Sequence, residues 1–255
     1  MFTVRHSKGL LMLKVENLTG GYQHLKILDN VSFEVADGEV VGLIGLNGAG
    51  KSTTIKHILG LLRPQSGTIA LNDQNLTQDA IHYRQQIAFV PETPILYPEL
   101  TLKEHLELTI MAYQLDAAVA WEKANELLEI FRLDQMLDWF PIHFSKGMQQ
   151  KVMIVNAFMT EADLLIIDEP FTGLDPLAVH NLLDLIAAKK AENKSILMTT
   201  HVLATAQAQA DRFILLNHGQ VRAQGTVAEL ASQFGVEPQN IDQIYLQMAR
   251  ENGDA

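Results

Sequence analysis

The sequence contains no cysteine among its 255 residues. It can therefore form neither a disulfide nor a thiolate metal site, and its composition fits a reducing compartment. Apolar stretches near Val40 and Leu164 are short and bounded by polar residues. They do not reach the roughly 18 residues that a membrane-spanning helix needs. Residues 1–9 are polar and basic without an apolar centre, so we expect no secretory signal there.

Basic residues are also scarce. The chain has 19 Lys and Arg against 30 Asp and Glu, which gives a net charge of −11. A nucleic-acid partner normally requires a basic face, so we expect none. Internal repeats and low-complexity linkers are absent as well. With 47% hydrophobic residues, the chain can form one large domain, or one core with a small lobe.

Strand-like and helix-like segments alternate along much of the chain. Residues 11–16 and 27–35 have the alternation of strands, and Gly20-Gly21 between them is expected to be a turn. Strands alternating with helices predict an α/β fold with a mostly parallel sheet and right-handed crossovers. Further strands are expected at 39–44, 67–71, 87–90, 164–167, 195–199 and 213–216.

Residues 102–140 differ from this pattern because they are helical throughout, with no strand signal. Thr101 followed by Glu104 forms a capping box that starts the first helix. We expect the helical block at about 100–160 to be an insertion in the α/β core. The tail from Thr226 is expected to form two short helices, and its part from about 236 either packs on the core or binds a partner.

Residues 45–53, Gly-Leu-Asn-Gly-Ala-Gly-Lys-Ser-Thr, satisfy the phosphate-loop pattern G-x-x-x-x-G-K-[ST]. Its glycines let successive N–H groups turn toward a nucleotide's phosphates. Lys51 is expected to reach the β- and γ-phosphates, and the Ser52 hydroxyl to bind Mg²⁺. A helix over 52–61 adds positive potential at its N-terminus. The predicted nucleotide-binding residues are Gly45, Leu46, Asn47, Gly48, Ala49, Gly50, Lys51, Ser52 and Thr53.

Asp168 and Glu169 follow the apolar strand at 164–167. The carboxyl end of a strand in a parallel sheet faces the ligand crevice. Asp168 is therefore expected to hold Mg²⁺, directly or through water. Glu169 is placed to polarise an attacking water as a general base. The alternative is that two acidic residues merely end a surface strand, and the phosphate loop favours the catalytic interpretation.

Residues 144–150, Phe-Ser-Lys-Gly-Met-Gln-Gln, resemble the LSGGQ-type signature motif of the ATP-binding subunits of ABC transporters. Ser145 and Gly147 match this motif, whereas Phe144, Lys146 and Met148 depart from it. Ser145 can cap a helix running to about residue 158, and a helix N-terminus suits a γ-phosphate. Lys146 adds a cation there. The resemblance implies that Ser145, Lys146 and Gly147 bind the nucleotide of a second subunit, which we expect to be an identical copy.

Three further segments carry this resemblance. Tyr22 occupies the position where the family stacks an aromatic ring on adenine. Residues 173–176, Gly-Leu-Asp-Pro, are similar to the loop that crosses the dimer interface, which gives Asp175 a role at the nucleotide. His201 is similar to the switch histidine that contacts the γ-phosphate. The resemblance thus implies that His201 is a catalytic residue, as Lys51 and Glu169 are.

Glu92 departs from the family, which normally has a glutamine at this position. A carboxylate keeps an oxygen acceptor but loses the amide donors and adds charge. We expect Glu92 to be a third Mg²⁺ ligand, beside Ser52 and Asp168, and to retune coupling to the membrane partner. A tolerated substitution without functional effect is the alternative.

The resemblance covers residues 12–235, leaving 1–11 as an extension and 236–255 as a tail. Residues 90–94, 102–113 and 144–148 are most similar to the Ecs-type ATPase subunits, which share Glu92 and Lys146. The resemblance implies a P-loop NTPase core, a mostly parallel sheet with an antiparallel β subdomain, and an inserted helical subdomain. It also implies Mg²⁺-dependent ATP hydrolysis that drives a separate integral membrane permease from the cytoplasmic face of the membrane, with a link to protein secretion.

Other classes fit the sequence less well. ABC ATPases that act on nucleic acid or ribosomes usually carry tandem domains or basic patches. A GTPase would show N-K-x-D, but Asn193-Lys194 is followed by Ser195-Ile196. A poorly hydrolysing regulatory subunit is disfavoured by Glu169, whereas Glu92 leaves it open. The transported substrate and the direction of transport stay open too.

Overall fold

The computed structural model describes residues 11–23, 25–236 and 241–251. Its centre is a six-stranded sheet with the strand order β5-β6-β7-β3-β8-β9. All neighbouring strands in it are parallel except the last pair, which is antiparallel. The predicted α/β class with a mostly parallel sheet is confirmed. The strands are β3 (Val40–Ile44), β5 (Ile87–Val90), β6 (Leu164–Asp168), β7 (Ser195–Thr199), β8 (Arg212–Asn217) and β9 (Gln220–Gly225).

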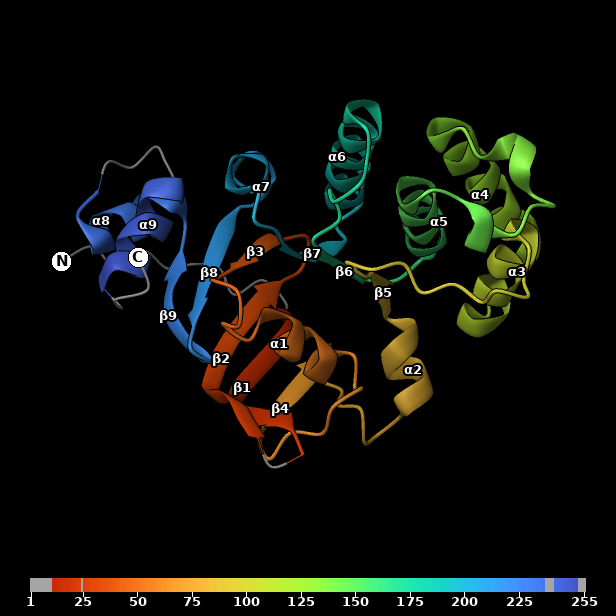
Figure 1. Ribbon diagram of the computed structural model, residues 1–255. Helices are drawn as coiled ribbons and strands as arrows, with labels where there is room; N and C mark the ends of the chain where they lie inside the picture. Colours follow the sequence, from red (N-terminus) through yellow and green to blue (C-terminus); the bar gives the residue numbers. More distant parts are fainter. Residues whose placement is uncertain (1–10, 24, 237–240, 252–255) are drawn as a thin grey trace.

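A second, antiparallel sheet has the order β2-β1-β4 and lies beside the first (Figure 1). It consists of β1 (Leu11–Tyr22), β2 (Leu25–Ala36) and β4 (Ser66–Leu71). Helix α1 (Lys51–Ile58) shares a hydrophobic core with both sheets, through Ile55 and Ile58. The helix that follows the phosphate loop is thus held between the two sheets.

The predicted turn at Gly20-Gly21 is wrong, because both residues lie within β1. Gly20 pairs with Leu28 and Gly21 with Lys26, at shifts in the strand register. A Cβ on Gly21 would lie 2.1 Å from the carbonyl oxygen of Leu25. These glycines therefore permit close backbone approach, and the strand continues to Tyr22.

Helices α3 (Leu102–Tyr113), α4 (Ala117–Phe131) and α5 (Lys146–Phe158) gather beyond β5, the edge strand of the large sheet (Figure 1). Short 3₁₀ helices, η1 (Asp134–Met136) and η2 (Pro141–His143), lie between α4 and α5. The predicted capping box is present: the Thr101 N–H donates to Glu104 Oε2 at 2.7 Å, and the Glu104 N–H donates to Thr101 Oγ1 at 3.3 Å.

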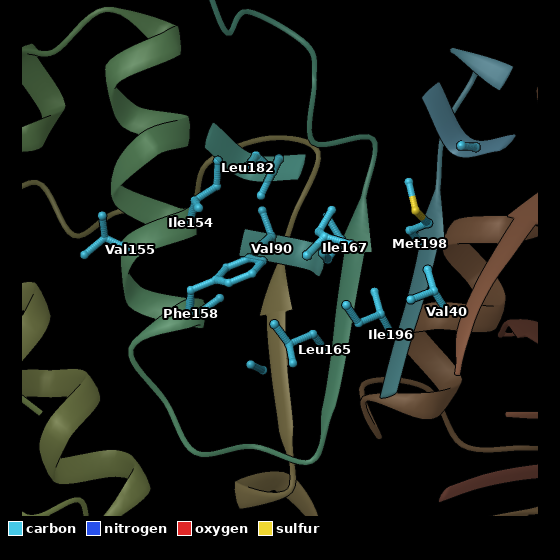
Figure 2. Packing of buried hydrophobic residues seen from close by; sticks show 14 of the residues in the cluster. Val40, Val90, Ile154, Val155, Phe158, Leu165, Ile167, Leu182, Ile196 and Met198 are labelled. Atoms are coloured by element: carbon cyan, nitrogen blue, oxygen red, sulfur yellow. The ribbon is translucent and has the colours of Figure 1, made fainter. Parts of the chain in front are cut away.

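Side chains of α5 pack directly on the large sheet. Figure 2 shows Phe158 of α5 near Val90 of β5 and Leu165 of β6, with Leu182 on the neighbouring helix α6 (Pro176–Ala191). All four side chains are buried. The helical block and the sheet therefore share one continuous core, and the division at about 100–160 stays a prediction.

The two predicted tail helices are α8 (Val227–Phe234) and α9 (Ile241–Glu251). Ile241, Ile244 and Met248 of α9 are fully buried, and the Ile241 N–H donates to Gln207 Oε1 of α7 (Leu203–Gln209) at 3.0 Å. Helix α9 is therefore packed onto the body of the protein. Strand β9 and the short helix α2 (Ala80–Gln85) were not predicted from the sequence. In the part of the chain that the structure describes, no helix is both long and apolar enough to cross a membrane.

Candidate functional site

A cavity of about 650 Å³ lies at the carboxyl ends of β3 and β6. The carboxyl ends of parallel strands meet at one edge of a sheet, so loops far apart in the sequence converge there. The phosphate loop, the two acidic residues at the end of β6 and single residues after β5 and β7 all contribute. The lining consists of Ile27, Leu46, Asn47, Gly48, Ala49, Gly50, Lys51, Ser52, Thr53, Glu92, Asp168, Glu169 and His201.

The phosphate loop has the backbone that its glycines permit. Gly48 and Gly50 have φ angles of 80° and 108°, in the left-handed region that favours glycine. At Gly45 a Cβ would lie 2.2 Å from the Leu216 carbonyl oxygen, so no larger residue fits. The Lys51 ammonium donates to the Gly45 carbonyl oxygen at 2.7 Å. The loop and its lysine thus line one end of the cavity, where the phosphates are predicted to bind.

Asp168 is nearly buried at the floor of this cavity, with 7% of its surface exposed. Its Oδ1 accepts a hydrogen bond from the Thr199 hydroxyl at 2.5 Å, because the β6–β7 register sets these two residues side by side. Burial raises the pKa of Asp168, and the negative charge of Glu92 raises it further, against the opposing hydrogen bonds from Thr199 and Ser52. Negative charge is therefore concentrated between Glu92 and Asp168.

Ser52, Glu92 and Asp168 form a donor set that fits Mg²⁺. They supply one hydroxyl and two carboxylates, and Mg²⁺ prefers oxygen ligands. A divalent cation would also compensate the charge that raises the pKa of Asp168. Among the described residues, no group of three His, Cys, Asp or Glu could hold a metal ion. Further ligands would come from phosphate oxygens and water, as is usual for Mg²⁺.

Glu169 and His201 form a bonded pair at the cavity. Glu169 Oε2 accepts the His201 N–H at 2.9 Å and lies 2.7 Å from His201 Nδ1. The Glu169 side chain is 12% exposed and that of His201 is 71% exposed. Glu169 has a φ of 48°, a left-handed conformation that a non-glycine residue adopts at a cost. Its N–H is held by the Thr199 hydroxyl at 3.1 Å.

Tyr22 lies beside the cavity but does not line it. Its hydroxyl accepts a hydrogen bond from Lys56 at 2.9 Å, and the Tyr22 side chain also bonds to Thr53, which is a lining residue. The residue is 40% exposed. The ring is thus within reach of a ligand that extends from the phosphate loop, and its contact with adenine stays a prediction.

Ser145, Lys146, Gly147 and Asp175 form a separate cluster that does not line this cavity. Ser145 caps α5, since its Oγ accepts the Met148 N–H at 3.3 Å. Gly147 lies against Gly173, because a Cβ on it would be 2.3 Å from the Gly173 carbonyl oxygen.

Asp175 caps α6 by accepting the Ala178 N–H at 2.9 Å, and it pairs with Lys151 at 2.7 Å. Both hydrogen bonds lower the pKa of Asp175, with the one from Lys151 the larger effect. The signature motif and the loop at 173–176 therefore meet within one chain, at the starts of α5 and α6.

Two residues at the cavity were not predicted from the sequence. Ile27 of β2 lines it, and Thr199 bonds both Asp168 and Glu169. Thr199 ends a predicted strand two residues before His201, which is a weak signal for a site residue. Its pairing with Asp168 depends on the neighbouring positions of β6 and β7, which the local sequence does not specify.

Known proteins resemble this chain along nearly its whole length. The ABC transporter family model matches residues 28–172. The chain is 52% identical over 241 residues to the ABC-type transporter ATP-binding protein EcsA of Bacillus subtilis (strain 168), covering 94% of this chain and 98% of that protein.

Solved structures agree with this. An ATP-binding subunit of an ABC transporter has a TM-score of 0.91 and 51% identity, covering 93% of this chain and 99% of that one. A dimeric ATP-binding cassette in a post-hydrolysis state with ADP and Pi has a TM-score of 0.74 and 27% identity. The match covers 84% of this chain and 98% of that one. The chain therefore belongs to the ATP-binding subunits of ABC transporters, a family of ATPases.

Proposed function

We propose that this chain binds ATP and Mg²⁺ in the 650 Å³ cavity and hydrolyses ATP there. The observation that carries the proposal is the convergence of Lys51, Asp168, Glu169 and His201, from separate segments, on one cavity. Lys51 and the loop N–H groups bind the phosphates. Ser52, Asp168 and Glu92 would hold Mg²⁺, which neutralises phosphate charge when bound.

Glu169 is the proposed general base. Its carboxylate lines the cavity, and its Oε2 is oriented by His201, so it can accept a proton from a water that attacks the γ-phosphate. His201 is exposed and adjacent, and it contacts the γ-phosphate in this proposal. Most of the rate enhancement then comes from positioning and charge stabilisation.

The active form is proposed to be a head-to-tail dimer of identical copies. Ser145, Lys146, Gly147 and Asp175 lie outside the cavity of their own chain, which supports a role at the nucleotide of the second copy. The dimeric structure of the related cassette bound to ADP and Pi also supports it. The nucleotide favours closure because it contacts both copies only in the closed state.

A separate membrane permease is the proposed partner. Exposed apolar side chains near the start of α3 support a docking surface for it. Tyr97 and Trp139 are both exposed. Both lie beside the start of α3, because the Tyr97 N–H donates to His105 at 3.0 Å and the Trp139 carbonyl oxygen accepts the Leu102 N–H at 2.9 Å. Other exposed apolar side chains of this region are Ile95, Phe140 and Ile142.

We place the ATPase domain at residues 12–235 and its helical subdomain at about 100–160. Membership of the ATP-binding subunits of ABC transporters supports a proposed position at the inner face of the cell membrane. The link to protein secretion stays a prediction.

The decisive test is the mass in solution of the wild type and of Glu169→Gln, with and without ATP and Mg²⁺. We expect ATP to produce a dimer of the variant, because hydrolysis no longer reopens it, and Mg²⁺-dependent ATPase activity in the wild type only. A hydrolytically inactive variant that stays monomeric with ATP would contradict the homodimer. A variant that hydrolyses ATP at the wild-type rate would contradict the role of Glu169.

A further inference from the structure

The end of β1 rests on two consecutive residues of α1. Gly20 lies directly against the imidazole of His57, since a Cβ on Gly20 would be 2.5 Å from His57 Nε2. His57 is buried, and its Nδ1 donates to the Leu62 carbonyl oxygen at 3.1 Å. The imidazole is therefore fixed, and it fixes the backbone two residues before Tyr22.

Lys56, the residue before His57, holds the side chain of Tyr22. Its ammonium lies 2.9 Å from the Tyr22 hydroxyl and 5.2 Å from the ring centroid. The ammonium is thus at the hydroxyl end of the ring and not above its centre, so the contact is a hydrogen bond in the first place and at most a weak cation–π interaction. The centre of each ring face is left clear of the cation. Consistently, the hydrogen bond from Lys56 lowers the pKa of Tyr22.

Lys56 itself does not line the phosphate cavity, although Lys51, Ser52 and Thr53 on the same helix do. The contact with Tyr22 is therefore the route by which we expect Lys56 to act on a nucleotide whose base extends past the cavity. A ring that is restrained in advance loses less conformational entropy when a base stacks on it. Stacking of a base on an aromatic side chain contributes about 1–3 kcal/mol, so its orientation affects affinity measurably.

We propose that Lys56 is a positioning residue for the nucleotide base, which holds the Tyr22 ring at the margin of the cavity through its hydroxyl. This inference rests on the proposed ATP site. It adds a residue of α1, the helix that also carries Lys51, to the base end of that site. Helix α1 would then set both ends of the nucleotide, the phosphates through its N-terminus and the base through Lys56.

The test compares Lys56→Met, Tyr22→Phe and the double variant in ATP binding, with inorganic tripolyphosphate as a probe that lacks a base. Each single variant is expected to raise the Kd and KM for ATP about threefold to tenfold, as loss of one hydrogen bond would, with kcat unchanged. The double variant should bind ATP no more weakly than Tyr22→Phe alone, because Tyr22→Phe already removes the contact with Lys56, together with the bond to Thr53. Lys56→Arg should restore binding, since it keeps the donor.

Tripolyphosphate binding should be the same in all these variants. The matched control is Lys103→Met, which removes an exposed lysine on α3 that is paired only with Glu107 among the ion pairs of the described residues. Equal weakening of ATP and tripolyphosphate by Lys56→Met would overturn the inference, because the lysine would then act on phosphates. The inference would also be overturned if the Kd of the double variant for ATP rose by the product of the increases in the two single variants. A wild type that binds neither ligand would instead overturn the proposed function.

Discussion

At the scale of single residues, Thr199 links the two acidic residues of the site. Its hydroxyl donates to Asp168 at 2.5 Å and accepts the Glu169 N–H at 3.1 Å. A hydroxyl is suited to this task because it donates and accepts at once. Asp168 is nearly buried, so its carboxylate depends on such a donor. The left-handed backbone of Glu169 is held by the same side chain.

Thr199→Val is therefore expected to impair both stability and catalysis. Valine keeps the shape but removes both hydrogen bonds of the hydroxyl, which leaves the buried carboxylate of Asp168 with Ser52 as its remaining hydroxyl donor and should cost about 1–3 kcal/mol of unfolding free energy. Loss of the contact to Glu169 should lower kcat about tenfold, as for a modest misplacement of a general base. Urea unfolding and steady-state ATPase measurements check this. Thr199→Ser is the control because it keeps the hydroxyl. If Thr199→Val matched Thr199→Ser in both stability and kcat, the role of the hydroxyl would be refuted.

At the scale of elements, Tyr113 joins the helical block to the sheet. It is the last residue of α3, and its hydroxyl donates to the Ile87 carbonyl oxygen of β5 at 2.6 Å. The edge strand of a sheet has unpaired backbone groups, and this contact satisfies one of them. Burial raises the pKa of Tyr113 to about 12.

This raised pKa predicts a specific loss of stability in alkali. The folded state favours the neutral phenol, so the contribution of Tyr113 is fully present below its ordinary pKa of 10.0 and is lost as the pH rises toward about 12. Tyr113→Phe should be less stable at pH 8, by about 1 kcal/mol for the lost hydrogen bond.

Between pH 10 and 12 this variant should lose less stability than the wild type. Some loss persists because burial also raises the pKa of Tyr83 and Tyr245. Urea unfolding across this pH range measures both effects. An unchanged alkaline slope in Tyr113→Phe would show that this phenol does not titrate as described.

At the scale of the whole molecule, the predicted nucleotide contacts fall into two groups. Lys51 and the acidic residues line the cavity, whereas Ser145 and Asp175 start α5 and α6 outside it. This division supports the proposal that one chain carries half of each of two sites. In the proposed dimer, each complete site combines Lys51 of one copy with Ser145 of the other.

Mixing two inactive variants tests this arrangement. Lys51→Ala and Ser145→Arg should each be inactive alone, because both sites of either homodimer are damaged. In an equal mixture about half of the dimers contain one copy of each variant. Each of these mixed dimers has one intact site and one site with both changes. About a quarter of the wild-type ATPase activity should therefore return. A mixture as inactive as its components would contradict sites shared between copies.

The sequence alone determined the features that depend only on residues close together along the chain. The phosphate loop at 45–53 needs its glycines wherever it occurs, and Thr101 with Glu104 caps a helix through groups three residues apart. Pro91 ends β5, and Ser145 starts α5 as its cap. These features were predictable because each depends on neighbours along the chain.

Tertiary structure decided the rest. Gly20 and Gly21 have the composition of a turn, but pairing with β2 makes them part of a strand. The bond between Thr199 and Asp168 exists because β6 and β7 are neighbours in register, and the contact of Lys56 with Tyr22 exists because α1 packs beside the end of β1. Residues far apart in the chain meet only when sheet order and register are set by burial of the common core, and no local pattern specifies either.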